Sequence, residues 1–506
     1  MAPGIERNGF SKTSSSMKPH VMMVSSLGHG HLLPFMQLSK KLASRGFTIS
    51  FVTTFHHMPF LQNKVNAAQE DGLDIRLLEV KVPQDHLTLG KVNSNSVQWH
   101  HLPPILAAND RLQPHFELFL DDFLQRTDDY NLTRPLCLIA DFLLGWASAV
   151  ATKFGIPRVN FECSGSFSES VHEIVWKILP RNLERTTSGR YLVPDIPREI
   201  RLKPSQMLPE LPEATETNGT HLFWKCHRAG NKQSWRTITN TFYELEGEFV
   251  DFFEKVYGPV RTIGPLLPPE AFQDSRKIIP AAVEMGSNTD ELRCLQWLDR
   301  QAPRSVIYVS FGSENSVSSA QVMELAMGLE RSRQKFLWVL RRPTDAGEAS
   351  GSALDYLPNG FCDRVKEKDE GLIVLGWAPQ LSILAHPSTG GFLSHCGWNA
   401  VLETTVMGVP MIAWPLYAEQ HFNAKFVVDL VKIAVEAPQR AEENWLVRSD
   451  DIERVVRLLL EEEKGKELKA RVDELKKIAR VAVSEGGSSS NNFDLFVREI
   501  LALEEQ

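Results

Sequence analysis

The chain lacks the features that mark membrane, secreted and nucleic-acid-binding proteins. No apolar run in its 506 residues reaches the roughly 18 residues of a membrane-spanning helix, and residues 1–17 have no apolar core of a secretory signal. Its six cysteines are spread out without a CxxC pair, which disfavours a disulfide framework and a zinc site. A net charge of −8 disfavours nucleic acid as a partner. We therefore expect a cytoplasmic protein without a membrane span that begins with a disordered tail, residues 1–17.

The composition is that of a globular protein, and the length exceeds that of one compact core. Hydrophobic residues make up 42% of the chain and charged residues 23%, so we expect two or three domains. Both halves alternate short apolar runs with amphipathic stretches. Strands are expected at 20–26, 47–53, 305–311 and 335–341, and the first helix is expected to open at Pro34. This alternation predicts an α/β fold with doubly wound parallel sheets, whose ligands bind beyond the carboxyl ends of the strands.

The region from Trp377 to Gln420 concentrates polar, aromatic and glycine residues. Residues 390–396 form an apolar run that predicts a buried strand, Gly397 breaks it, and a helix is expected from Asn399. Free N–H groups at such a helix start suit a pyrophosphate. Glu403, one turn further on, could accept hydrogen bonds from two ribose hydroxyls. Trp377 offers a flat face to a base, and Gln380 an amide to its edge.

A second polar group follows the first expected strand, at residues 28–31. It is not a dinucleotide fingerprint, because Leu33 stands where the third glycine would be. The HxH spacing could bind a metal, but no further ligands follow at the right spacing, so we expect no metal. Asp141 follows the apolar run 136–140 and could either orient a histidine or cap the next helix.

The region 377–420 resembles the nucleotide-sugar box of plant-type family 1 UDP-glycosyltransferases. The resemblance implies the GT-B architecture, in which two Rossmann-like domains face a cleft. It also implies that one set of residues binds the UDP-sugar: Ser313, Trp377, Gln380, His395, Gly397, Trp398, Asn399, Ala400, Glu403, Glu419 and Gln420. Trp398 taken alone is more typical of a core residue. Position 400 usually holds Ser in that family, so Ala400 removes one hydroxyl that could contact a phosphate.

The same resemblance separates the two histidines. The family has Gly-His, then two residues and then Pro, which matches residues 30–34, so His31 rather than His29 is expected to be the catalytic base. Asp141 stands in the context of the aspartate that orients this base. The implied domains are an acceptor-binding domain at 18–264, a linker at 265–289, a donor-binding domain at 290–485 and a C-terminal helix at 486–506 that packs back on the first domain.

The resulting hypothesis is an inverting glycosyltransferase that acts as a monomer on a small hydrophobic hydroxylated acceptor such as a phenolic, terpenoid or steroid. The UDP-sugar is a co-substrate, and no cofactor is expected. Gln420 favours glucose, because an amide can accept from one sugar hydroxyl and donate to its neighbour while Glu419 accepts from another pair. Two alternatives stay open. An NAD-dependent dehydrogenase is disfavoured by Leu33 and by Thr53-Thr54, where an acidic residue would stand. A non-catalytic small-molecule binder is suggested only by Ala400.

Overall fold

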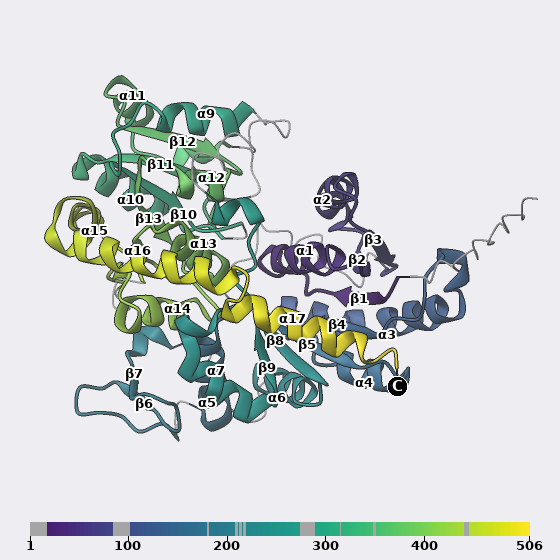
Figure 1. The fold of residues 1–506 in the computed structure, drawn as a ribbon. Coiled ribbons are helices and arrows are strands. Elements are labelled where there is room, and N and C mark those ends of the chain that lie inside the picture. The colour runs from purple at the N-terminus through teal and green to yellow at the C-terminus, as the bar shows by residue number, and fades with distance from the viewer. Residues whose placement is uncertain are drawn as a thin grey trace, which may run out of the picture.

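The computed structural model describes most of the chain as two α/β domains joined by helices (Figure 1). The described residues are 18–83, 102–179, 182–207, 211, 215, 219–273, 289–313, 315–347, 351–439 and 445–505. The expected tail at 1–17 and most of the expected linker lie outside them. We call the part that contains β1 to β9 the first domain and the part that contains β10 to β15 the second domain.

The first domain is built on a seven-stranded sheet with the order β3-β2-β1-β4-β5-β8-β9, in which all pairs are parallel. The order in which successive strands are added reverses between β1 and β4, and the gap beyond their carboxyl ends is where such sheets bind ligands. The strands are β1 His20–Val24, β2 Thr48–Thr54, β3 Ile75–Val80, β4 Cys137–Asp141, β5 Arg158–Glu162, β8 Arg236–Thr239 and β9 Val260–Thr262. The helices are α1 His29–Ala43, α2 Met58–Glu70, α3 Leu102–Gln125, α4 Ala147–Lys153, α5 Ser166–Ile178, α6 Gly219–Asn231 and α7 Tyr243–Tyr257. A small antiparallel hairpin is formed by β6 Tyr191–Val193 and β7 Ile200–Leu202.

The second domain has a six-stranded parallel sheet with the order β12-β11-β10-β13-β14-β15. In this sheet the order of successive strands reverses between β10 and β13. The helix α13, which follows β13, therefore starts at the ligand-binding edge. The strands are β10 Val306–Ser310, β11 Lys335–Leu340, β12 Gly371–Leu375, β13 Thr389–Ser394, β14 Met411–Ala413 and β15 Ala434–Glu436. The helices are α9 Thr289–Leu298, α10 Ser319–Ser332, α11 Phe361–Glu367, α12 Gln380–Ala385, α13 Trp398–Met407, α14 Gln420–Lys425, the π-helix η8 Phe426–Leu430, α15 Ser449–Glu461 and α16 Glu463–Val483. Short 3-10 helices occur at η3 Asp128–Tyr130, η5 Pro204–Gln206, η6 Pro269–Phe272 and η7 Ala353–Tyr356.

Buried apolar strands explain why these sheets form. Every residue of β1, β2, β4, β5, β10 and β13 is buried. A parallel sheet covered by helices on both faces excludes water from both sides, and near-continuous apolar runs are its sequence signature. These apolar runs form the strands of the two sheets, and the polar residues that follow them lie at the strand ends.

The last helix, α17 Ser488–Leu501, crosses from the second domain onto the first (Figure 1). Glu499 accepts hydrogen bonds from Arg236 at 3.1 Å and from Arg261 at 2.9 Å, which stand on β8 and β9. The Asn492 amide donates to the Thr262 hydroxyl at 2.9 Å. These contacts attach the end of the chain to the edge of the first sheet.

The start of α1 differs from the expectation. The helix begins at His29 after an extended Gly28, so Pro34 lies inside the helix rather than at its opening. The prediction that Pro34 opens the helix is therefore wrong. A proline inside a helix has no N–H for the carbonyl four residues earlier, which here is that of Gly30. That carbonyl needs another donor, and the site below supplies one.

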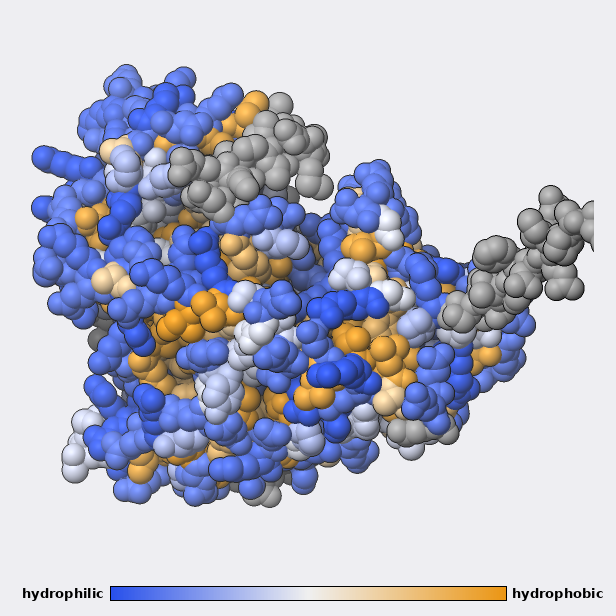
Figure 2. All heavy atoms as spheres, viewed as in Figure 1, coloured by the Kyte–Doolittle hydropathy of each residue, from blue (hydrophilic) through white to orange (hydrophobic). Residues whose placement is uncertain are grey.

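The visible face of the molecule is mostly hydrophilic, with hydrophobic residues in scattered groups (Figure 2). Over the stretches that the structure describes, no helix combines the length and the apolar character needed to cross a bilayer.

Candidate active site

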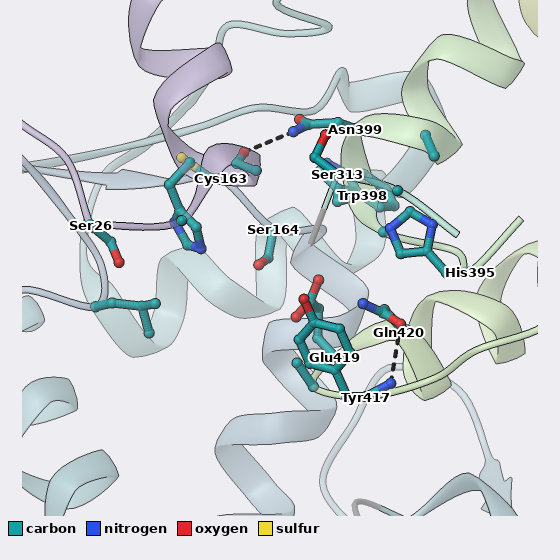
Figure 3. Close-up of a pocket in the computed structure, with 18 of the residues that line it drawn as sticks. Ser26, Cys163, Ser164, Ser313, His395, Trp398, Asn399, Tyr417, Glu419 and Gln420 are labelled. Atoms are coloured by element: carbon teal, nitrogen blue, oxygen red, sulfur yellow. Dashed lines mark hydrogen bonds between the residues drawn. The ribbon is translucent and has the colours of Figure 1, made fainter. Parts of the chain in front are cut away.

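A cavity between the two domains is lined by residues from the carboxyl ends of both sheets. Figure 3 shows Ser26, Cys163 and Ser164 of the first domain across the cavity from His395, Glu419 and Gln420 of the second. Most of the residues that the sequence selected line this one cavity: His31, Ser313, Gln380, His395, Gly397, Trp398, Asn399, Ala400, Glu403, Glu419 and Gln420. Asp141 lies behind His31, and Trp377 lies outside the lining.

His31 and Asp141 form a hydrogen-bonded pair at the edge of the cavity. Nδ1 of His31 lies 2.8 Å from Oδ2 of Asp141, whose side chain is fully buried at the end of β4. The other carboxylate oxygen accepts the N–H of Leu143 at 2.9 Å, so Asp141 also closes the following turn. The carboxylate can only accept, which places the ring proton on Nδ1 and leaves the Nε2 lone pair as a base.

His29 takes a different position, although it stands only two residues away. Its ring contacts Phe60 edge-on, with the ring centroids 4.7 Å apart, and it does not belong to the cavity lining. His31 instead stacks on Phe142, which lines the cavity. The first turn of α1 thus points the two histidines in different directions, and only His31 faces the cavity.

His31 and Asp141 also meet Cys163, and the three could be read as a metal site. Their ligand atoms lie within 4.8 Å of one another. A thiol binds metals as the thiolate, but burial and the charges of Asp141 and Glu162 raise the pKa of Cys163 well above its ordinary value. The cysteine therefore favours the protonated form, and this donor set fits a metal poorly.

The turn between β13 and α13 is shaped around His395. A Cβ at position 397 would lie 2.5 Å from Nε2 of His395, and one at position 312 would lie 2.7 Å from its Cε1. Gly312 also has a φ of +85°, which side chains rarely adopt. Only glycines allow this imidazole to pack at the N-terminus of α13. The first N–H groups of that helix, including that of Ala400, have no intrahelical partner and can bind an anion.

Gln380 and Glu403 form a second hydrogen-bonded pair at the cavity. The Gln380 amide donates to Glu403 at 2.6 Å, and the Tyr308 hydroxyl contacts the Gln380 oxygen at 3.4 Å. Burial raises the pKa of Glu403 to about 7, despite the hydrogen bond from Gln380. Trp377, on the loop after β12, is 59% exposed, so much of its indole is open to solvent.

Glu419 and Gln420, which were expected to bind the sugar, line the cavity. The Gln420 oxygen accepts the backbone N–H groups of Leu416 and Tyr417, both at 3.1 Å. Because both acceptor positions are then taken, the expectation that this amide accepts from a sugar hydroxyl is wrong, and only its NH₂ group can face a sugar. Burial and the negative charge of Glu169 raise the pKa of Glu419 to about 7.

Trp398 and Asn399 reach across the cleft to the first domain. The Trp398 indole donates to the Asn240 carbonyl at 2.7 Å, and its ring is 3% exposed. Trp398 was expected to bind the donor, but its one polar atom is used in joining the domains. The Asn399 amide donates at 2.7 Å to the Gly30 carbonyl, the one that Pro34 leaves without a helical donor (Figure 3).

Part of the cavity wall was not found from the sequence. Trp224 of α6 and Leu106 of α3 line it, as do Glu169 and His172 of α5. The signal that could have found Glu169 and His172 is their i, i+3 spacing, which places both on one face of α5.

Two parallel sheets whose carboxyl edges meet at one cavity define a GT-B fold, and a helix N-terminus there with a paired histidine is typical of a glycosyltransferase.

The family model described as UDP-glucoronosyl and UDP-glucosyl transferase matches residues 271–479. Anthocyanin 3'-O-beta-glucosyltransferase of Gentiana triflora is 35% identical, over 95% of this chain and 98% of that protein. Scopoletin glucosyltransferase of Nicotiana tabacum is 33% identical, over 95% and 98%. The solved structure of Phytolacca americana UGT2 with UDP-2-fluoro-glucose and pterostilbene has a TM-score of 0.77 at 28% identity, covering 96% of this chain and 100% of that one. The chain belongs to the family of plant-type UDP-glycosyltransferases, and it is an enzyme that transfers a sugar from a UDP-sugar to a small acceptor.

Proposed function

We propose that the enzyme transfers glucose from UDP-glucose to a hydroxyl of a small, largely apolar acceptor with inversion at the anomeric carbon. The observation that carries the mechanism is the His31–Asp141 pair at 2.8 Å, which borders the same cavity as the donor residues. Relatives named as glucosyltransferases of an anthocyanin and of scopoletin support a phenolic acceptor. The family assignment removes the dehydrogenase alternative.

The proposed reaction begins at Nε2 of His31. This nitrogen takes the proton of the acceptor hydroxyl while the oxygen attacks the anomeric carbon from the side opposite UDP. The bond to UDP breaks, and UDP leaves with the electron pair. Asp141 holds the ring in place and stabilises the imidazolium that forms, as a buried carboxylate at Nδ1 does. The start of α13 and His395 receive the charge that develops on the leaving phosphate.

The donor is proposed to lie along the second domain. Trp377 and Gln380 would hold the uracil, and Glu403 the ribose. Ser313, His395 and the start of α13, from Gly397 to Ala400, would hold the phosphates. Glu419 would accept hydrogen bonds from the sugar, and the NH₂ group of Gln420 would donate to it. Within the described residues the cavity lining has no lysine or arginine. A neutral hexose therefore fits better than a uronic acid, whose carboxylate would meet Glu419 without a cation.

An assay of UDP release tests this proposal. The purified protein is given UDP-glucose with a panel of hydroxylated phenolics, terpenoids and steroids, and the products are identified by mass and anomeric configuration. An inverted β-glucoside of at least one acceptor is expected. UDP-glucose binding without release of UDP across the panel would favour the non-catalytic binder that Ala400 suggested, and retention of configuration would refute the base mechanism.

A further inference from the structure

One polar pair on the acceptor side of the cavity has no place in the reaction described so far. Glu169 and His172 stand one turn apart on α5, and both line the cavity. They are only 5% and 4% exposed, so each is held by the protein around it. Nδ1 of His172 lies 3.5 Å from Oε2 of Glu169, and Trp176 donates to the other ring nitrogen at 2.7 Å. A charged side chain is costly to bury, and such a group in a ligand cavity suggests a polar partner.

The surroundings keep Glu169 ionised. Burial would raise the pKa of Glu169, but the hydrogen bond to His172 and the charge of Arg228 outweigh it, so the pKa is lowered. Arg228, 3.9 Å from the carboxylate, is itself engaged by Glu173 and contacts His172. Arg228 and His172 thus partly compensate the negative charge of Glu169, which at the same time lines the cavity.

The position of Glu169 assigns it to the acceptor. It stands on the first domain, in a wall that also holds apolar side chains such as Phe142, Leu143 and Trp224. The groups proposed to bind UDP and the sugar all come from the second domain. The charge of Glu169 acts on Glu419, and the described lining residues include no lysine or arginine. An anionic acceptor would be repelled here, whereas a hydroxyl hydrogen can be accepted.

We propose that Glu169, supported by His172, is an acceptor subsite that binds a second hydroxyl, besides the one that is glycosylated, and excludes acceptors that carry a carboxylate. This inference rests on the proposed function of the same cavity. The substrate class is accordingly an apolar compound with at least two hydroxyls and no acidic group. Loss of a hydrogen bond to a charged group that stays buried gives discrimination of about 10- to 100-fold between acceptors.

The test compares phenolic acceptors that share one skeleton and differ in a single group: one hydroxyl, two hydroxyls, or one hydroxyl and a carboxylate. The wild-type kcat/KM is expected to favour the dihydroxylated compound by about 10- to 100-fold. In Glu169→Gln this preference should fall to within about threefold of unity. The kcat/KM of the carboxylated compound should rise relative to that of the other two compounds. Glu169→Asp keeps the charge but withdraws the oxygens, so it should lose the preference and still reject the carboxylate.

Glu246→Gln is the matched control. Glu246 accepts the N–H groups of Ser166 and Phe167 at the start of the same helix, and it does not line the cavity. This variant should retain the wild-type preference, which shows that a disturbance of α5 is not the cause. An unchanged preference in Glu169→Gln would overturn the proposal. A Glu169→Gln variant whose main defect is weaker UDP-glucose binding would also overturn it, because the residue would then serve the donor. Failure of the wild type to glycosylate any acceptor would instead refute the proposed function.

A second inference rests on Pro34. We infer that Asn399 is a positioning residue that ties the helix of the catalytic base to the helix of the donor site. Its amide donates to the carbonyl of Gly30, next to His31, and the N–H that would serve that carbonyl in a regular helix is missing because position 34 is proline. The amide has a second hydrogen, which remains available for a phosphate. One side chain can therefore set the distance between base and leaving group.

A double-mutant cycle tests this coupling. Pro34→Ala restores the missing N–H and is compatible with a helix interior. Asn399→Ala should lower kcat by about 5- to 10-fold more in the wild-type background than in the Pro34→Ala background. Its effect on UDP affinity should be equal in both backgrounds, because the phosphate contact does not depend on Pro34. Equal losses of kcat in the two backgrounds would show that Asn399 acts only through the phosphate and would overturn the inference.

Discussion

Binding of UDP-glucose is expected to release protons near neutral pH, because it favours the ionised forms of two buried carboxyl groups. Burial raises the pKa values of Glu403 and Glu419 to about 7 each. Ribose and sugar hydroxyls that donate to these groups stabilise the carboxylates and lower both pKa values. The affinity for UDP-glucose should accordingly rise with pH up to about 8 and then level off.

The size of the effect follows from the two pKa values. At pH 7 each group is about half protonated in the free enzyme, and a fall of two or more pKa units on binding releases about 0.5 proton from each. The sum is about one proton at pH 7 and under about 0.1 at pH 9. Glu403→Gln and Glu419→Gln should each remove about half of the release at pH 7.

Calorimetry in buffers with different ionisation enthalpies measures the released protons directly. UDP-glucose without acceptor is the right ligand, because a terminal phosphate like that of UDP titrates near pH 6 and would add its own protons. Release below about 0.2 proton in the wild type at pH 7 would refute the assignment of both carboxylates to the donor. Release that persists in full in Glu403→Gln would refute the ribose contact alone.

Three further predictions concern single groups. His31→Ala should lower kcat by about 100- to 10,000-fold with UDP affinity retained, whereas His29→Ala should have a mild effect in the same UDP-release assay; the reverse order would refute the choice of base. Gly397→Ala would place a Cβ 2.5 Å from His395, so UDP affinity measured by tryptophan quenching should fall by about tenfold or more. Comparison of kcat/KM should favour UDP-glucose over UDP-galactose and UDP-glucuronic acid, and in Gln420→Ala the preference over UDP-galactose should shrink; a wild-type preference for another sugar would refute the donor assignment.

Local patterns in the sequence were enough to predict the parallel sheets and the start of α13. Strands such as β10 and β13 are buried on both faces, so each appears as an uninterrupted apolar run with glycines or polar residues at its end. The residues of the box from 377 to 420 lie close together in the chain, and the strand–turn–helix unit that carries His395 and Asn399 fixes their relation locally. For that reason most of these residues line one cavity, as expected.

The errors arose where one group has two possible partners. The sequence analysis placed the helix start at Pro34, because a proline's missing N–H is harmless there. The helix begins earlier, and the Gly30 carbonyl accepts a hydrogen bond from Asn399, 369 residues away. The amide of Gln420 was expected to use its oxygen for a sugar, yet the loop just before it uses that oxygen first. The sequence shows which atoms can form hydrogen bonds, and only the folded structure shows which of them are already bonded to other parts of the chain.

The sequence by itself determined the α/β fold, the family and the residues of the donor box, because periodicity, glycine positions and short-range spacing act within a few turns of chain. The tertiary structure decided the rest: that His31 meets Asp141 110 residues away, that His29 does not face the cavity, and that α5 brings Glu169 to the acceptor wall. These contacts form where helices and strands of distant segments pack, and their geometry depends on side-chain volumes throughout both domains. The family's local Gly-His pattern was enough to propose the base, and the box was enough to propose the donor residues. Because no local pattern contains the contacts between distant segments, the acceptor wall required the fold.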